Sequence, residues 1–90
     1  MNSVGILGFG RFGKVLTNIL QKGFDVNVHD KNKNENFGRV NFVSLNSLLK
    51  EKTIFISVPI RDFENVIKTI SPKIEKGTTI LDVCSVKKYP

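Results

Sequence analysis

Three glycines near the amino terminus have the spacing of a phosphate-binding turn. Gly8, Gly10 and Gly13 directly follow a short apolar segment and directly precede an amphipathic one. In this setting the first glycine permits a tight turn, the second lets the backbone approach a diphosphate, and the third lets a helix pack closely. The free amides and partial positive charge at such a helix start bind anions. We therefore expect this loop to hold a pyrophosphate.

The residues between these glycines differ in what they can contribute. Phe9 lies inside the loop, so we include it among the cofactor-binding positions. Arg11 falls in the first helical turn, where its side chain either contacts a phosphate or points into solvent, and the sequence leaves both open. Phe12 belongs to the same loop, but its apolar side chain favours the core over the ligand.

A carboxylate stands where the ribose of a bound dinucleotide is expected. Asp30 lies twenty positions after Gly10, directly after the second predicted strand, residues 25–29. A carboxylate there accepts hydrogen bonds from the adenosine ribose hydroxyls and repels a 2′-phosphate, which favours NAD over NADP. Lys31 and Lys33 follow and could reach a phosphate, so NADP stays open, with Lys31 as a candidate contact. The alternative for Asp30 is a solvated charge at the end of a strand.

Two further segments bring candidate side chains to the same region. Val58 and Pro59 follow an apolar run and either pack against the ribose or nicotinamide or simply end a strand. Ser85 could hydrogen-bond a substrate hydroxyl or the nicotinamide end, although its spacing alone favours an ordinary loop residue. Cys84 has no histidine nearby in the sequence and is expected to pack in the interior. His29 is expected on the exposed side of its strand, without a catalytic role.

Strands and helices alternate along the chain. Five strands are predicted, at residues 3–8, 25–29, 40–43, 53–58 and 78–83. Helices are predicted at residues 11–22, 45–49 and about 61–70, with Ser44 and Gly23 as start and end signals. The polar residues 31–39 are predicted to form a loop in place of a helix. This pattern predicts a Rossmann-type α/β fold, an open parallel sheet in the order 3-2-1-4-5 with helices on both faces.

Length and composition limit the classes of function. The 90 residues suit one dinucleotide-binding domain and leave no room for a second, catalytic domain. The net charge of +6 suits an anionic ligand, whereas the scattered lysines form no basic stripe of the kind that nucleic acid requires. One cysteine and one histidine give no readable metal site. The single cysteine, the lack of a long apolar run and the lack of a signal peptide favour the cytoplasm over a membrane.

Four segments resemble the nucleotide-binding half of prephenate and arogenate dehydrogenases, and the resemblance covers essentially the whole chain. The segments are GILGFGRFGK, SLNSLL, ISVPI and ILDVCSVKKYP. The first is shared by many dehydrogenases, whereas the pattern D-V-x-S-V-K in the last is much more specific.

The resemblance implies an oxidoreductase of tyrosine biosynthesis, which oxidises prephenate or arogenate by hydride transfer to NAD or NADP with loss of carbon dioxide. In the family, a serine matching Ser85 helps to position the ring hydroxyl of the substrate, and a histidine polarises that hydroxyl. That histidine lies in a G-T-H-P-like segment beyond residue 90, and the helical domain that completes the substrate pocket and dimerises the enzyme is also absent. We therefore expect the chain alone to bind the dinucleotide weakly and to turn over no prephenate.

Two expectations concern partners and alternatives. The fifth strand is expected at an exposed sheet edge, which invites pairing into a homodimer. The competing functions are another small-substrate dehydrogenase with the same glycine loop, and a non-catalytic sensor of NAD(H). The D-V-x-S-V-K pattern argues against the first, and the missing histidine keeps the second open.

Overall fold

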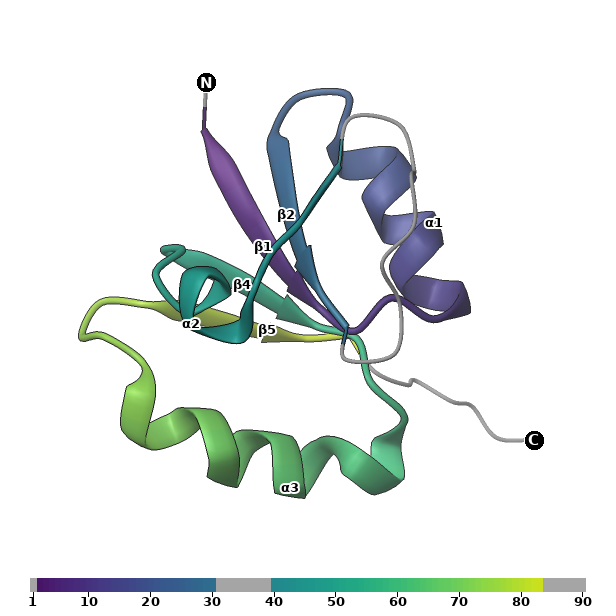
Figure 1. The fold of residues 1–90 in the computed structure, drawn as a ribbon. Coiled ribbons are helices and arrows are strands. Elements are labelled where there is room, and N and C mark those ends of the chain that lie inside the picture. Colours follow the sequence, from purple (N-terminus) through teal and green to yellow (C-terminus); the bar gives the residue numbers. More distant parts are fainter. Residues whose placement is uncertain (1, 31–39, 84–90) are drawn as a thin grey trace.

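A five-stranded parallel sheet in the order β3-β2-β1-β4-β5 forms the centre of the molecule (Figure 1). The computed structural model describes residues 2–30 and 40–83. The strands are β1 (Ser3–Leu7), β2 (Asp25–His29), β3 (Asn41–Phe42), β4 (Thr53–Ile56) and β5 (Thr79–Asp82). The helices are α1 (Arg11–Leu20), α2 (Leu45–Leu48) and α3 (Ile60–Ile70), followed by the 3₁₀ turn η1 (Ser71–Lys73). The predicted Rossmann-type fold and strand order are confirmed.

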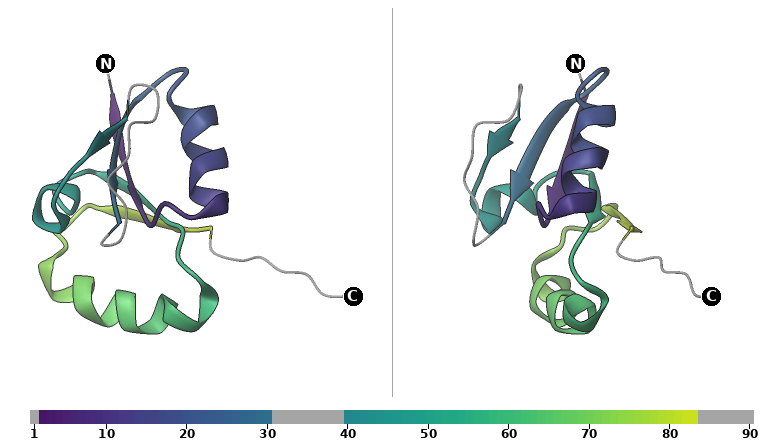
Figure 2. Two further views of the ribbon diagram at one scale, coloured as in Figure 1. Left: turned by 45° about the vertical axis from the view of Figure 1, so that its right-hand side comes forward. Right: turned by 90° about the vertical axis from the view of Figure 1, so that its right-hand side faces the viewer.

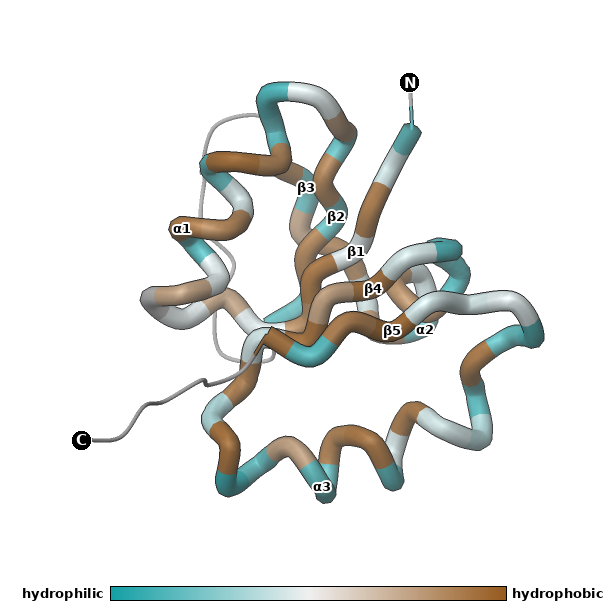
Figure 3. Tube along the Cα trace, turned by 180° about the vertical axis from the view of Figure 1, so that it is seen from behind, coloured by the Kyte–Doolittle hydropathy of each residue, from teal (hydrophilic) through white to brown (hydrophobic). Residues whose placement is uncertain are grey.

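The two faces of the sheet carry separate cores, as the alternation of side chains along the strands requires. Val4 and Ile6 of β1 pack in the cluster beneath α1, whereas Leu7 packs in the cluster beneath α2 and α3. Figure 2 shows the helices on opposite sides of the sheet, and Figure 3 shows the apolar strands between them. Each fully buried side chain of this kind contributes roughly 1.5–3 kcal/mol relative to an exposed one.

The carboxyl ends of the central strands meet at one edge of the sheet. Leu7 at the end of β1 pairs with His29 on β2 and with Ile56 on β4, and Ile56 pairs with Asp82 on β5. The turns that follow these strands therefore lie side by side, where an open parallel sheet binds its ligands.

Several predicted boundaries move by one or two residues. α1 ends at Leu20 with Gln21 as its cap, and Gly23 lies in the following turn without a left-handed φ, so Gly23 is not the predicted helix cap. β4 ends at Ile56, three residues before Pro59, which is instead the N-cap residue of α3, with a φ of −56°. The fixed φ of proline suits a helix start, which explains this difference. Ser44 caps α2 as predicted, since its Oγ accepts the amide of Ser47 at 3.2 Å.

Candidate dinucleotide-binding site

The turn after β1 requires glycine at its first position. Gly8 has a φ of +101°, which side chains rarely tolerate, and a Cβ there would lie 2.3 Å from the carbonyl oxygen of Ser57. The amide of Gly8 donates to the carbonyl of His29 at 2.8 Å, and the amide of Ser57 donates to the carbonyl of Leu7 at 2.8 Å. The turn is therefore held between the neighbouring strands β2 and β4.

The other two glycines of the loop differ in what surrounds them. A Cβ at Gly10 would meet nothing within 4 Å, so space is open in front of this residue. A Cβ at Gly13 would lie 2.6 Å from the carbonyl oxygen of Gly8 and 3.4 Å from Oγ of Ser57. Gly13 thus lets the first turn of α1 pack closely against the glycine turn and the end of β4. Gly10 gives an incoming group access to the backbone.

The start of α1 is arranged for an anion. Gly10 is the residue before the helix, no side chain caps the helix there, and the first turn contains no acidic residue. The unsatisfied amides and helix dipole therefore favour a negative group at this position. Lys14 adds positive charge nearby, with Nζ 5.8 Å from the centroid of the Phe9 ring. Arg11 is the first residue of α1. Its side chain is not among the described parts of the structure, so both alternatives for it, a phosphate contact or exposure to solvent, stay predictions.

Asp30 lies directly against the glycine turn. Its Oδ2 accepts the amide of Phe9 at 2.7 Å, across 21 positions of sequence. A carboxylate offers roughly four acceptor sites, so this bond is compatible with further bonds to ribose hydroxyls. The Phe9 ring is fully buried and packs edge-on against Phe42, with centroids 5.1 Å apart and planes at 83°. Phe9 therefore connects the turn to the core and to the carboxylate.

The expectation of a buried Phe12 is wrong. Phe12 is 51% exposed, and Val15 and Ile19 on the same side of α1 are similarly exposed. The helix instead turns Gly13 and Thr17 toward the sheet, since these small residues permit the close approach described above. The Phe12 side chain therefore lies on the surface beside the glycine turn.

A cavity of about 420 Å³ opens beside the glycine turn, between the carboxyl ends of β1 and β2 and the helices α2 and α3. It brings together Gly8, Asp30, Val58 and Pro59, four residues that the sequence had assigned to a cofactor site. His29 also lines it, half-buried, with Nδ1 2.9 Å from the carbonyl oxygen of Val43. The expected exposure of His29 is wrong, because Val43, the residue directly after β3, lies beside β2 and supplies this partner.

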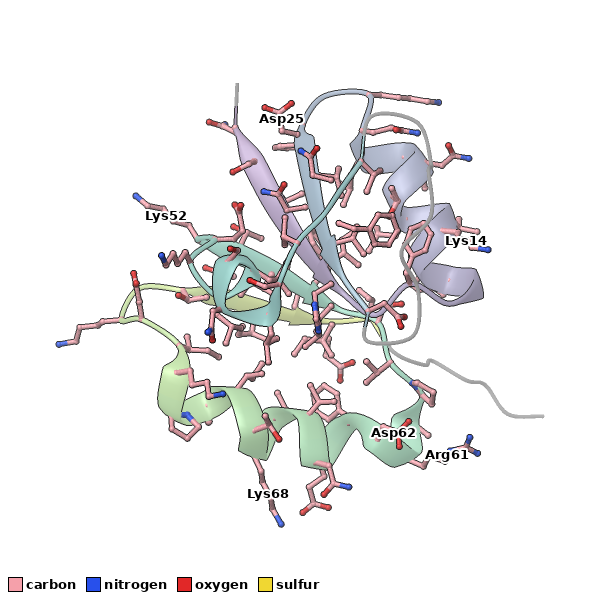
Figure 4. All side chains as sticks on the ribbon, in the orientation of Figure 1. Lys14, Asp25, Lys52, Arg61, Asp62 and Lys68 are labelled. Carbon is pink, nitrogen blue, oxygen red and sulfur yellow. The ribbon has the colours of Figure 1, made fainter. Side chains whose placement is uncertain are left out.

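α3 also contributes to this cavity, which was not predicted from the sequence. Asp62, Asn65 and Thr69 line it, together with the more buried Val66 and Ile70. The signal was present as a polar stripe at helical spacing beside an apolar one, and Figure 4 shows Asp62 near the start of α3. The predicted positions Lys31, Cys84 and Ser85 lie outside the described residues.

Residues 17–90 match the family described as the nucleotide-binding domain of prephenate dehydrogenase. The chain belongs to this family. This confirms the resemblance drawn from the sequence. The matched stretch begins inside α1, so the glycine turn is assigned from its own geometry.

A relative with a similar sequence is a much longer protein. A probable arogenate/prephenate dehydrogenase of Methanocaldococcus jannaschii is 33% identical over 94 aligned positions, which cover 96% of this chain and 20% of that protein. The chain thus spans about a fifth of that relative's length.

Two solved dehydrogenase structures share the fold. The NAD complex of a D-isomer specific 2-hydroxyacid dehydrogenase from Lactobacillus delbrueckii ssp. bulgaricus has a TM-score of 0.76 at 22% identity, covering 92% of this chain and 27% of that one. The NAD complex of an NAD-dependent formate dehydrogenase from Staphylococcus aureus has a TM-score of 0.78 at 22% identity, covering 96% of this chain and 27% of that one. Within residues 2–30 and 40–83, no helix is long and apolar enough to span a membrane.

Proposed function

We propose that residues 1–90 form a single NAD-binding domain of a prephenate or arogenate dehydrogenase. The observation that carries the proposal is the start of α1. Open space faces Gly10, no acidic residue occupies the first turn of α1, and Asp30 accepts the amide of Phe9 at 2.7 Å. A diphosphate at the glycine turn and a ribose at Asp30 match this arrangement of donors and acceptors.

The cavity supports the adenosine half of the same ligand. Its volume of about 420 Å³ lies within the range of roughly 300–1,000 Å³ that is usual for small-molecule sites. Val58 and Pro59 supply apolar surface beside the ribose position. Asp30 disfavours a 2′-phosphate by charge repulsion, so we expect NAD before NADP, with Lys31 as the residue through which NADP would be accommodated.

NAD, when bound, supplies the hydride acceptor for an oxidation, and the chain binds and orients it. The reaction we assign is the oxidative decarboxylation of prephenate or arogenate in tyrosine biosynthesis, with Ser85 helping to position the ring hydroxyl. We assign the acid–base histidine and the substrate pocket to a domain outside these 90 residues. A small-molecule substrate binds only when that domain is present, so the chain alone turns over none. We place the protein in the cytoplasm.

Calorimetric titration of the chain with NAD, NADP and ADP-ribose tests the proposal. We expect NAD and ADP-ribose to bind at one site, and NADP to bind about 10-fold more weakly because of the charge of Asp30. The Asp30→Asn variant should bind NAD and NADP with more similar affinities than the original chain does. Failure of NAD and ADP-ribose to bind at millimolar concentration would contradict the proposal.

A further inference from the structure

The α3 wall of the cavity has a polar stripe that the diphosphate and the ribose leave unused. Asp62, Asn65 and Thr69 are spaced at i, i+3 and i+7, so they share one side of the helix, and all three line the cavity. Val66 and Ile70 supply its apolar part on the same helix. This wall therefore combines an apolar surface with a polar edge.

Two of these polar side chains are available to a ligand. Oγ1 of Thr69 already donates to the carbonyl of Asn65 at 2.9 Å. In the part of the chain that the structure describes, no hydrogen bond or ion pair reaches the side chains of Asp62 and Asn65. Glu64 of the same helix, by contrast, lies outside the cavity lining and faces Lys68, with Oε2 4.0 Å from Nζ.

The group that reaches this wall follows from the proposed function, on which this inference rests. The diphosphate occupies the glycine turn and the ribose occupies Asp30, which leaves the base for the remaining lining. That lining includes Val58, Pro59 and Val66, which suit the flat apolar face of a purine. The edge of the purine then meets the polar stripe of α3.

We propose that Asp62 and Asn65 read the amino edge of adenine and select it over a 6-oxopurine. A carboxylate can only accept hydrogen bonds, and the 6-amino group of adenine donates them. The amide of Asn65 can donate to the adjacent ring nitrogen N1, which accepts. Hypoxanthine reverses both positions, since its O6 accepts and its N1–H donates. A 6-oxopurine would place an acceptor against the acceptor Asp62 and a donor against the donor Asn65, which weakens its binding.

Nicotinamide hypoxanthine dinucleotide is the probe, because it differs from NAD only at this edge. Titration of the chain with both dinucleotides should show about 10-fold tighter binding of NAD. The double exchange D62N/N65D keeps the net charge and the set of side chains but reverses donor and acceptor. In this variant we expect the preference for NAD to be lost or inverted.

Glu64→Gln is the matched control, since it removes a carboxylate from the same helix outside the cavity and should leave the ratio of the two dissociation constants unchanged. Asp62 and Asn65 are exposed, so the exchange should leave the circular dichroism spectrum intact. Equal binding of both dinucleotides by the original chain overturns the inference while the proposed function stands. An unchanged ratio in D62N/N65D overturns it as well. Absence of NAD binding overturns the proposed function and this inference together.

Discussion

The helices α1 and α3 begin in opposite electrostatic environments. α3 carries Asp62 in its first turn and Lys68 in its last, the order that a helix dipole favours. α1 has no acidic residue in its first turn and instead has Lys14 there, an unfavourable arrangement for an isolated helix. Neither start has a side-chain cap, so the difference lies in charge. The chain itself therefore supplies a negative charge at the start of α3, whereas at the start of α1 we expect an external anion to supply it.

The largest effect is expected from closing the space in front of α1. Gly10 has a φ of −82° and a ψ of −158°, an extended conformation that valine adopts readily, and a Cβ there meets no protein atom within 4 Å. Gly10→Val should therefore fold normally but lose about 100-fold in NAD affinity by calorimetry, since the side chain occupies the position of the diphosphate.

Gly23→Val is the matched control for this substitution. A Cβ at Gly23 also meets no atom within 4 Å, and this residue lies in the turn after α1, away from the glycine turn. It should leave the NAD affinity unchanged. An equal loss of affinity in both variants would show that α1 responds to any added side chain and does not bind the diphosphate.

A smaller effect is expected at Asp30. Asp30→Asn retains an oxygen that can accept the Phe9 amide but removes the charge. NAD should bind about 10-fold more weakly, because charged acceptors form the stronger hydrogen bonds with the ribose. Asp25→Asn, at the exposed start of β2, is the control and should behave as the original chain. An unaltered NAD affinity in Asp30→Asn would show that the Asp30 carboxylate does not contact NAD.

A stability change of about 1 kcal/mol is expected from the buried side of α1. Thr17 is fully buried, and its Oγ1 has no hydrogen-bond partner among the described residues. Thr17→Val replaces this oxygen with a methyl group, which should raise the free energy of unfolding by about 1 kcal/mol in urea. The NAD affinity should stay constant. A lower free energy of unfolding for Thr17→Val would contradict this prediction and show that the Thr17 hydroxyl forms a hydrogen bond in solution.

The smallest effect concerns self-association at the sheet edge. β5 is the last strand of the described sheet, and Leu81 on it is 40% exposed. We expect weak dimers, seen as a sedimentation coefficient that rises with protein concentration. Leu81→Lys should reduce that rise, because a charge on an edge strand opposes pairing. Sedimentation as a monomer at all concentrations would contradict this expectation.

The fold and the main binding loop could be predicted from the sequence because their signals are local. Apolar runs that alternate with helical patterns predict the strand order through the rules for parallel sheets. The glycine spacing predicts the turn, and Asp30 follows at the distance set by one helix and one strand.

The remaining features depend on tertiary contacts. The hydrogen bond from the Phe9 amide to Asp30 joins positions 21 apart, and no local pattern predicts it. α1 is apolar on more than one side, so its sequence does not reveal that Gly13 faces inward while Phe12 faces solvent. The polar stripe of α3 resembles any solvated helix face until the sheet places a cavity beside it.

A crystal structure of the chain grown with NAD tests the central claim most directly. The account predicts diphosphate oxygens within about 2.7–3.2 Å of the amides that open α1, and ribose hydroxyls at the same distance from the Asp30 carboxylate. The start of α3 should carry no phosphate. A diphosphate bound elsewhere, or a glycine turn without ligand in crystals that contain NAD, would contradict the account.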